Sequence, residues 1–558
     1  HVHRPRSAVG ALCAVMALLL TACAGATAAA GNVPRDDAAQ VADVALPSGA
    51  AQARQPTAPP VDGEGEPRWQ MAPQWATNPE MLPGSTRFQE LARKGTPTPG
   101  EPTNVVMITT DDMTASDLRW MPKTRALIGG AGVAFEDSLS PHPLCCPARA
   151  QLLTGQYAQN NHVRSNHWPS GGYRALDSSN TLPVWLQQAG YQTAFLGKYL
   201  NQYGEMNPRE VPPGWDYWNA AVSRVYDFYN FTTNVNGRLH RYSGTYQTEM
   251  YADETERLIP EMAAGDRPFF LWQSHLAPHV ACPSWVGRNE LECWMPPTPS
   301  TQHNSWYEDL TPPQLSDPSY DERDVSDKPR YVARRPRLDP ARRAQLTELF
   351  QERVESLRAV DDAVARTVDA LKRAEVLDET LVVFTSDNGY LMGEHRLTGK
   401  IVPYEPSLRV PLLMRGPGVP EGVRRPATTG TLDLAPTVLA AAGASAGLPV
   451  DGMNLLPVAA GEAPGWETVL IQGGPRHGGQ EWFYRGVRTH RYTYVEYRRS
   501  GEVELYDRQR DPHQLHNVAG SDAYAVVQAE LRDRLLALQD CAGASCRQRF
   551  GPAPEPRG

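Results

Sequence analysis

The chain has 558 residues, a formal net charge of −9 at pH 7 and a sequence pI near 5.9. This acidic balance excludes a general nucleic-acid binder. At 61.5 kDa the chain can bury a large core, and its 50 prolines and 45 glycines indicate long loops.

The first residues have the pattern of an export signal. A basic start precedes an apolar run over residues 8–20, which is too short to span a bilayer comfortably. The run ends in Leu20-Thr21-Ala22-Cys23, which resembles the lipobox of bacterial lipoproteins. The resemblance implies a signal peptide over residues 1–22 and lipidation of Cys23. A plain signal peptide cut near Ala26 or Ala30 stays open as the alternative.

Residues 23–100 are rich in Ala, Pro, Gly and Gln and show little apolar periodicity. We expect them to form a tether followed by a loosely structured lead-in. The exported protein would then be lipid-anchored on the outer face of the bacterial cytoplasmic membrane, or secreted.

Residues 101–457 are predicted to form an α/β catalytic domain, because short apolar runs alternate with helical patterns. A long helix is expected to begin at Asp339-Pro340, since apolar residues recur every three or four positions from Leu346 to Leu371. A further helix is expected over residues 432–441. Four apolar runs are predicted to be buried strands: residues 104–109, 193–196, 268–272 and 381–384.

Residues 458–546 are predicted to form a smaller C-terminal α+β subdomain, and residues 547–558 a tail. Within it, residues 483–497 and 502–506 are expected to be antiparallel strands separated by a turn at residues 498–501. An amphipathic helix is expected over residues 523–538.

Polar residues follow each predicted strand of the catalytic domain at its carboxyl end. In open α/β sheets ligands bind beyond these ends, so parallel neighbours would bring the side chains into one cleft. Two of the groups, the Asp111-Asp112 and Asp387-Asn388 pairs, offer only hard oxygen ligands, which favours Ca²⁺, or alternatively Mg²⁺, over zinc. In chain order the residues are Asp111, Asp112, Lys198, His275, His279, Asp387 and Asn388.

The segment from Leu144 to Gly155 carries the most specific pattern. Cys145, Pro147 and Arg149 match the C-x-P-x-R signature of the formylglycine-dependent sulfatases, which share the alkaline-phosphatase-like superfold. Because Pro147 suits a first helical turn, Cys145 is expected at a helix N-terminus, where free N–H groups favour an anion. The run Gly197-Lys198-Tyr199-Leu200-Asn201 lacks the second histidine of many sulfatases, and this form resembles the N-acetylglucosamine-6-sulfatases and heparan endosulfatases.

The resemblance implies a large, mixed, mostly parallel sheet sandwiched by helices. It also implies that Cys145 is oxidised to Cα-formylglycine by a formylglycine-generating enzyme. Cys146 does not fit, since Ala148 and Ala150 stand where the proline and arginine are needed. In the implied cycle the hydrated aldehyde attacks sulfur, the alcohol departs and sulfate is then expelled.

The same resemblance assigns roles to individual residues. The implied catalytic set, in which His279 protonates the leaving group, is Cys145, Arg149, Lys198, His279 and Lys400. The implied metal ligands are Asp111, Asp112, Asp387, Asn388 and Cys145. Candidate substrate-binding residues are Asn201, His275 and His395.

Export also permits disulfides. Two local bridges are predicted, one between Cys282 and Cys293 and one between Cys541 and Cys546. A bridge between the adjacent Cys145 and Cys146 would be strained.

The substrate is expected to be a sulfated saccharide such as 6-O-sulfated N-acetylglucosamine. Trp215, Tyr217 and Trp218 either stack on a sugar ring or pack internally. Likewise, the arginines between Arg330 and Arg343 either attract a polyanionic glycan or form a solvated face beside the acidic segment 321–327. Three other functions stay open: a broad arylsulfatase, a phosphate or phosphonate monoester hydrolase of the same superfold, and a surface glycan-binding lipoprotein without turnover.

Overall fold

The structure is a computed structural model that describes residues 103–282, 295–475 and 479–557. The predicted signal peptide, Cys23, the tether and Cys293 lie outside these residues. Among the described residues, no helix combines the length and apolarity that a membrane crossing requires.

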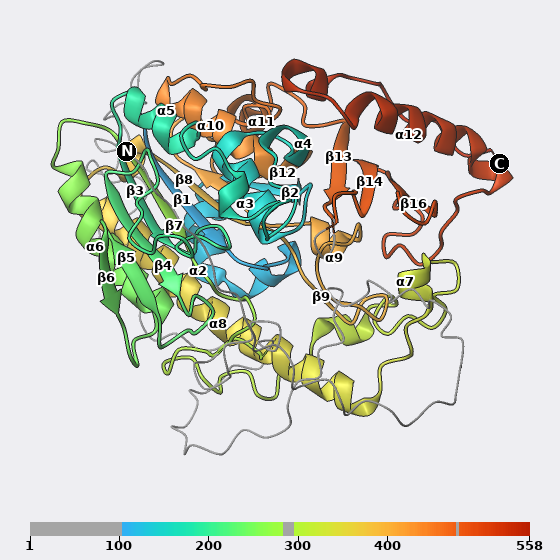
Figure 1. Ribbon diagram of the computed structural model, residues 1–558, viewed down its shortest axis with the longest axis horizontal. Coiled ribbons are helices and arrows are strands. Elements are labelled where there is room, and N and C mark those ends of the chain that lie inside the picture. The colour runs from blue at the N-terminus through green and yellow to red at the C-terminus, as the bar shows by residue number, and fades with distance from the viewer. Residues whose placement is uncertain (1–102, 283–294, 476–478, 558) are drawn as a thin grey trace, which may run out of the picture. The chain divides into compact units, whose positions relative to one another are not determined.

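A ten-stranded mixed sheet forms the centre of the described chain, as predicted (Figure 1). Its order is β12-β2-β11-β8-β1-β7-β3-β4-β5-β6, and the five neighbours from β8 to β4 run parallel. The strands are β1 (Asn104–Thr110), β2 (Val133–Leu139), β3 (Gln192–Gly197), β4 (Tyr217–Ser223), β5 (Thr232–Val235), β6 (Arg238–Arg241), β7 (Phe269–Ser274), β8 (Thr380–Ser386), β11 (Leu412–Arg415) and β12 (Val423–Gly430). The four runs predicted as buried strands are β1, β3, β7 and β8.

Helices cover both faces of this sheet, because successive side chains of a strand point to opposite sides. Val105 and Met107 of β1 pack with α3, α5 and α10, whereas Val106 and Ile108 pack with α6 and α8. The helices are α2 (Pro122–Thr124), α3 (Cys145–Thr154), α4 (Ala158–Asn161), α5 (Leu182–Gln188), α6 (Gln247–Ala263), α7 (Arg330–Ala333), α8 (Pro340–Arg373), α9 (Glu405–Leu408), α10 (Leu434–Ala442), α11 (Leu456–Ala460) and α12 (Ala525–Leu538).

The predicted start of α8 agrees with the structure, whereas the helices predicted from residues 432 and 523 begin two residues later. Asp339 caps α8 by accepting a 2.7 Å hydrogen bond from the backbone N–H of Arg342, and Pro340 occupies the first position. The helix predicted over residues 432–441 is α10, preceded by one 3₁₀ turn. The C-terminal helix begins at Ala525 and ends at Leu538.

The C-terminal sheet differs from the prediction. It has four antiparallel strands, β13 (Thr468–Gly473), β14 (Tyr484–Thr489), β15 (Tyr492–Glu496) and β16 (Val503–Asp507). The single strand predicted over residues 483–497 is wrong, since a turn at His490-Arg491 divides it. The Thr489 hydroxyl accepts hydrogen bonds from the N–H groups of Arg491 and Tyr492, which stabilises the turn.

Two cysteines close a short loop after α12. The Cys541–Cys546 disulfide is formed, with 5.0 Å between the Cα atoms. Because the other predicted bridge involves Cys293, it stays a prediction.

Candidate active site

Four parallel strands, β8, β1, β7 and β3, end side by side and position the polar residues that follow them. The N–H of Asp387 donates to the carbonyl of Thr110 at 3.1 Å, and the N–H of Lys198 donates to the carbonyl of Ser274 at 2.9 Å. These bonds continue the ladders of β8 with β1 and of β3 with β7 beyond the last strand residue. The sequence could predict each strand separately, but the pairing is what brings the residues together.

Asp112 turns back into the cluster because its backbone has a φ of +70°. Its N–H donates to Asp387 Oδ1 at 3.1 Å, and the Asn388 amide donates to Asp112 Oδ1 at 2.6 Å. Arg353 of α8 donates to the Asp112 carbonyl oxygen at 2.6 Å. The two predicted oxygen-ligand pairs are thus in direct contact.

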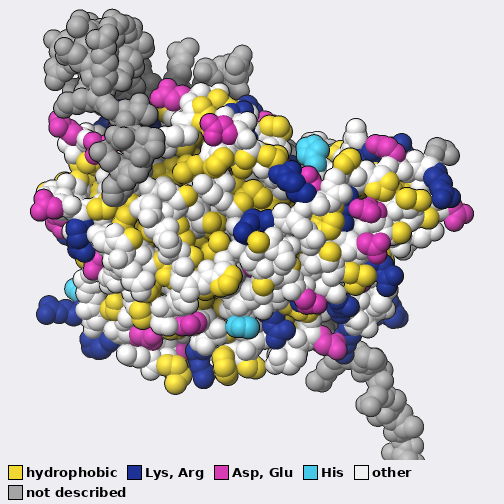
Figure 2. Space-filling view, turned by 90° about the horizontal axis from the view of Figure 1, so that it is seen from above, with side chains coloured by type: hydrophobic (Ala, Val, Ile, Leu, Met, Phe, Trp, Pro, Cys, Tyr) yellow, Lys and Arg dark blue, Asp and Glu magenta, His cyan; other side chains and the backbone are white. Residues whose placement is uncertain are grey.

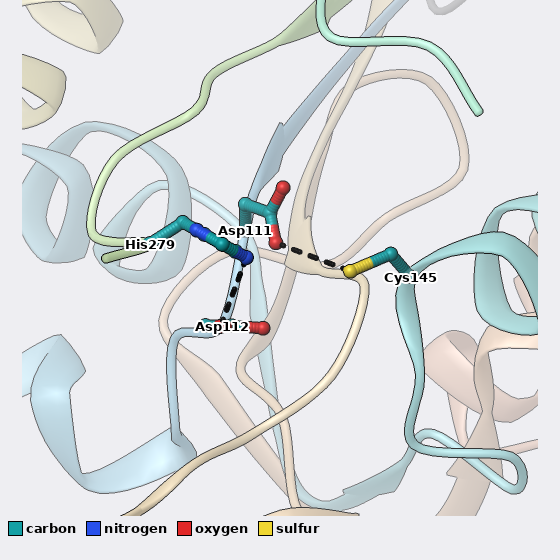
Figure 3. Close-up of side chains that lie close together, drawn as sticks. All are labelled: Asp111, Asp112, Cys145 and His279. Atoms are coloured by element: carbon teal, nitrogen blue, oxygen red, sulfur yellow. Dashed lines mark hydrogen bonds and ion pairs between the residues drawn. The ribbon is translucent and has the colours of Figure 1, made fainter. Parts of the chain in front are cut away.

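Cys145 is the first residue of α3, as the position of Pro147 predicted. Its Sγ atom lies 2.9 Å from Lys400 Nζ, 3.7 Å from Lys198 Nζ and 3.8 Å from Asp111 Oδ1. Lys400 reaches the thiol because the next residue, Ile401, donates its N–H to the carbonyl of Pro143 at 3.1 Å. Figure 3 shows Asp111 and Asp112 after β1, Cys145 at the start of α3 and His279 after β7, with their side chains close together.

Arg149 lies one helical turn beyond Cys145 and uses all of its guanidinium nitrogens. It binds Asp387 at 2.9 Å and Asp111 at 3.2 Å, and it donates to Ser274 Oγ at 2.7 Å and to the Lys198 carbonyl at 2.6 Å. Arg149 therefore ties α3 to the ends of β1, β3, β7 and β8.

Buried charges of both signs face each other here. Asp111 pairs with Lys198, and Asp112 with Lys400. Burial raises the pKa of Asp111, but the charges of Lys198, His279, Arg149 and Lys400 outweigh it and hold this pKa well below the usual range. Burial also raises the pKa of the Cys145 thiol, against the opposing effect of the two lysines.

The oxygen atoms fit a hard divalent cation. One ligand atom from each of Asp111, Asp112, Cys145 and His279 lies within 4.8 Å of the others. Asp112 Oδ2 and Asn388 Oδ1 are buried and accept no hydrogen bond from the described residues. A cation would satisfy both oxygens, and carboxylate and amide oxygens suit Ca²⁺ or Mg²⁺.

His279 lies beside this oxygen cluster. Its Nε2 is 3.6 Å from Asp112 Oδ2, and its Nδ1 is 2.8 Å from the carbonyl oxygen of Val280. Because a carbonyl can only accept, Nδ1 carries hydrogen and Nε2 is the nitrogen presented to the cluster. Burial lowers the pKa of His279 to about 4.

The three candidate substrate-binding residues have different surroundings. Asn201 binds the Cys146 thiol and donates to the Tyr226 hydroxyl at 2.7 Å, close to the cluster. His275 is buried, and neither ring nitrogen has a hydrogen-bond partner among the described residues. His395 binds Glu322 at 2.6 Å and lines a cavity of about 360 Å³ whose walls include none of the residues around Cys145.

Of the two interpretations of Trp215, Tyr217 and Trp218, the structure supports internal packing rather than stacking on sugar. Trp218 stacks on Phe195 with 4.7 Å between ring centroids, and Trp215 stacks on Phe270 at 5.9 Å. Tyr217 is partly buried, and its hydroxyl binds Glu254. Trp215 and Trp218 belong to the buried cluster on one face of the sheet, and Tyr217 packs against the cluster on the other face.

The arginines between Arg330 and Arg343 include partners of the neighbouring acidic segment. Arg337 and Arg343 both bind Asp321, and their side chains are about half exposed. The face in Figure 2 likewise intersperses basic and acidic side chains. These pairs favour a solvated charged face over a polyanion-binding surface.

Four contributors to the site were missed by the sequence reasoning. Ser274 binds Arg149, Arg353 binds Asp112, Asn166 accepts from the Cys146 N–H at 2.9 Å, and Tyr226 stacks on His279. No sequence motif marks Arg353 or Tyr226. Arg353 falls among the apolar positions of the predicted long helix, which are expected to face the core. A charged residue at such a position is the one sequence signal that could have identified it as a site residue.

Comparisons with known proteins agree with this geometry. The family model described as Sulfatase matches residues 103–444, and the model described as N-sulphoglucosamine sulphohydrolase, C-terminal matches residues 393–541. An arylsulfatase of Volvox carteri is 32% identical over 491 residues, covering 79% of this chain and 75% of its own. The N-acetylglucosamine-6-sulfatase of Capra hircus is 31% identical over 495 residues, covering 80% and 84%.

Solved structures share the fold at lower identity. BT4656, in complex with its substrate D-glucosamine-2-N,6-O-disulfate, has a TM-score of 0.65 at 23% identity and covers 79% of this chain and 98% of its own. The phosphonate monoester hydrolase of Agrobacterium radiobacter has a TM-score of 0.58 at 21% identity, covering 79% and 96%.

Proposed function

Because the chain belongs to the sulfatase family and is a sulfuric ester hydrolase, we propose that it cleaves sulfate esters of a sulfated saccharide, with a formylglycine at position 145 and one divalent cation. The observation that carries the proposal is the position of Cys145. It begins α3 and lies within 4 Å of Lys198 and Lys400, beside the oxygen atoms of Asp111 and Asp112.

The modified residue would supply the hydrated aldehyde that attacks sulfur, and the cation, bound by Asp111, Asp112, Asp387 and Asn388, would polarise the sulfate oxygens. Cys145 stands at the N-terminus of α3, where the positive end of the helix dipole favours a sulfate anion, while the Cys146 N–H is bonded to Asn166. Arg149 holds two of the carboxylates in place through a rigid, fully used guanidinium. Calcium is the proposed ion and magnesium the alternative.

Lys198 and Lys400 neutralise negative charge that develops on sulfate and on the leaving oxygen. His279 Nε2 gives its proton to the departing alcohol, with Lys400 beside the same oxygen. A neutral imidazole whose Nδ1 is held by Val280 must acquire that proton at Nε2 before each turnover.

The saccharide assignment is supported by two facts. The residues from Gly197 to Asn201 have the form found in N-acetylglucosamine-6-sulfatases, and enzymes of that name from goat, cattle and human are 30–31% identical to this chain. The arylsulfatases of Volvox and Chlamydomonas are 32% and 31% identical, so a broad arylsulfatase is the second candidate.

The test compares kcat/KM on 6-sulfated glucosamine oligosaccharides, a small aryl sulfate and the matched aryl phosphate. We expect the saccharides to be turned over and the phosphate to be the poorest substrate. Inert saccharides beside a fast aryl sulfate would contradict the substrate assignment. A preferred phosphate would favour the monoester hydrolase reading, and no turnover of any substrate would favour a glycan-binding lipoprotein.

Export and anchoring are part of the proposal. Two similar proteins, one from Caenorhabditis elegans and one from Drosophila melanogaster, are named as homologues of an extracellular sulfatase. These names support the proposal that the chain is exported. We propose that the mature chain begins at a lipidated Cys23, since two or more acyl chains give stable attachment. Cys23→Ala should move the protein from the membrane fraction to the medium, and a variant that stays membrane-bound would contradict the anchor.

A further inference from the structure

Tyr226 contacts two of the three basic groups proposed to act on sulfate and on the leaving oxygen, His279 and Lys198. Its ring stacks on the His279 imidazole with 4.7 Å between centroids and 28° between planes. The Lys198 ammonium lies 4.7 Å from the centroid of the same ring. One aromatic side chain therefore touches two candidate catalytic residues that come from different strand ends.

The Tyr226 ring is held at both ends. At its outer end the hydroxyl accepts a 2.7 Å hydrogen bond from the Asn201 amide, and Asn201 in turn binds the Cys146 thiol next to Cys145. At the backbone, the Tyr226 carbonyl accepts a 2.8 Å hydrogen bond from the N–H of Cys282, three residues beyond His279. The segment that carries the ring is thus fixed both to the segment that carries His279 and to α3.

The turn before and after Tyr226 is equally constrained. The N–H of Asp227 donates to the Arg224 carbonyl at 2.9 Å, and the Asp227 carboxylate accepts from the N–H groups of Tyr229 and Asn230 at 3.0 and 2.8 Å. A side-chain–backbone turn of this kind limits the backbone freedom on which the ring position depends.

Among the described residues, the His279 imidazole makes one hydrogen bond, between Nδ1 and the Val280 carbonyl. That bond fixes which nitrogen carries hydrogen, but it leaves the plane of the imidazole free to tilt about it. The stacked Tyr226 ring sets this plane and so the direction of Nε2. The negative face of the same ring attracts the Lys198 ammonium.

We propose that Tyr226 is a positioning residue that aims His279 Nε2 at the leaving oxygen through ring stacking, and that its hydroxyl serves to anchor the ring. This inference rests on the proposed role of His279 as the proton donor. It assigns no chemical step to Tyr226, since the phenol is already bound to Asn201.

The experiment compares kcat/KM on an alkyl sulfate, a 6-sulfated glucosamine, with that on an activated aryl sulfate. An alkoxide is the poorer leaving group, so it depends more on a correctly aimed proton donor. Tyr226→Leu should lower the alkyl value about 10- to 100-fold more than the aryl value. Tyr226→Phe keeps the ring and should leave the ratio of the two values within about 3-fold of the wild type, on the same reasoning.

A matched control is Tyr229→Leu, the same change three residues further along the same segment. The Tyr229 hydroxyl donates to the Pro299 carbonyl and its ring contacts Tyr246. This variant should leave the alkyl-to-aryl ratio unchanged. Should Tyr226→Leu fail to fold, Tyr226→Met, which fills similar space without an aromatic face, should shift the ratio in the same way.

The double variant His279→Ala/Tyr226→Leu separates the inference from the function on which it rests. If Tyr226 acts through His279, the double variant should have the same alkyl-to-aryl ratio as His279→Ala alone. Three outcomes would overturn the positioning role. The first is a further drop of this ratio in the double variant. The others are equal losses on both substrates for Tyr226→Leu, and a Tyr226→Phe variant as defective as Tyr226→Leu. Equal losses on both substrates for His279→Ala would instead overturn the proton-donor role.

Discussion

Arg149 Nε lies 2.9 Å from Asp387 Oδ2, and both side chains are almost completely buried. The pair joins the helix that begins with Cys145 to the end of β8, more than 230 residues later. The other guanidinium nitrogens bind Asp111, Ser274 and the Lys198 carbonyl. One planar group thus joins the ends of the four strands that carry the site, β1, β3, β7 and β8.

Arg149→Lys should therefore be severely defective. A single ammonium cannot make the four contacts that the guanidinium makes, so we expect kcat/KM to fall about 10²- to 10³-fold. Leaving Asp387 without its partner should also lower the free energy of unfolding by about 3–5 kcal/mol. Steady-state kinetics and chemical denaturation measure the two effects. Arg257→Lys, at an exposed helix position, should change neither, and a fully active Arg149→Lys would contradict this account.

Cys145→Ser should abolish turnover, whereas Cys146→Ala should keep activity within about 10-fold of the wild type. Only Cys145 has the proline and arginine spacing of the signature, and serine offers no route to the aldehyde where the matching oxidation is absent. Peptide mass spectrometry of the native protein should show that sulfur is lost at position 145 and kept at position 146. An unmodified Cys145 in fully active enzyme would exclude the formylglycine.

Asp112→Asn should weaken binding of the divalent cation. Asp112 Oδ2 is a buried oxygen without a hydrogen bond among the described residues, and replacing the carboxylate removes negative charge from the ligand set. Added Ca²⁺ should raise the unfolding temperature of metal-free wild-type enzyme, and this shift should shrink in the variant. Asp362→Asn, which changes a partly exposed carboxylate paired with Lys123, is the control. Elemental analysis that finds stoichiometric zinc and no calcium or magnesium would refute the assignment.

His279→Ala should lower kcat/KM for the hydrolysis of alkyl sulfates by about 10²- to 10⁴-fold. For activated aryl sulfates the loss of kcat/KM should be much smaller. An alkoxide needs the proton that Nε2 would deliver, while a stabilised phenolate can leave without it. The measurement is kcat/KM across a series of sulfate esters with leaving groups of decreasing acidity. If the dependence on the leaving group is the same in variant and wild type, His279 does not donate the proton.

Arg488→Ala should destabilise the junction between the main sheet and the C-terminal sheet. Arg488 of β14 binds Asp137 of β2 through both terminal nitrogens, one of them at 2.5 Å, and also binds Glu405 at 3.0 Å. Removing the cation takes from Asp137 its shortest ion pair and leaves Glu405 with only the longer contacts to Arg508 and Arg409, so the free energy of unfolding should fall by about 3–5 kcal/mol. The control is the exposed ion pair between Arg424 and Glu136, the residue before Asp137. Arg424→Ala should lower the free energy of unfolding by at most about 1 kcal/mol.

The Asp137–Arg488 contribution should also depend on pH. Burial raises the pKa of Asp137, but Arg488 outweighs this and holds the pKa well below its usual value. The unfolded carboxyl titrates near pH 3.9, so the stabilisation is fully present above that pH and is lost as pH falls through the lower folded pKa. The stability difference between wild type and Arg488→Ala should shrink between about pH 4 and pH 2. A difference independent of pH would mean that the pair acts through packing alone.

The sequence by itself determined four strands of the main sheet, the polar residues that follow them, and which cysteine matches the sulfatase signature. Four apolar runs ended in Asp111, Lys198, His275 and Asp387, and the spacing of Pro147 and Arg149 singled out Cys145 over Cys146. These are local properties, set by residue type, period and distance along the chain, which a single sequence carries in full. The helix starts at Asp339 and Cys145 follow from the same kind of signal.

Only the tertiary structure decided which distant residues meet. Parallel pairing of β8, β1, β7 and β3 placed Arg149 between Asp111 and Asp387. Packing of the loops brought Lys400 to the Cys145 thiol and stacked Tyr226 on His279. It also buried Trp215 and Trp218, because the face on which a strand residue lies depends on the neighbouring strands and helices as well as on its own alternation. Contacts between residues far apart in the chain are fixed by packing, and one sequence does not encode them in any local pattern.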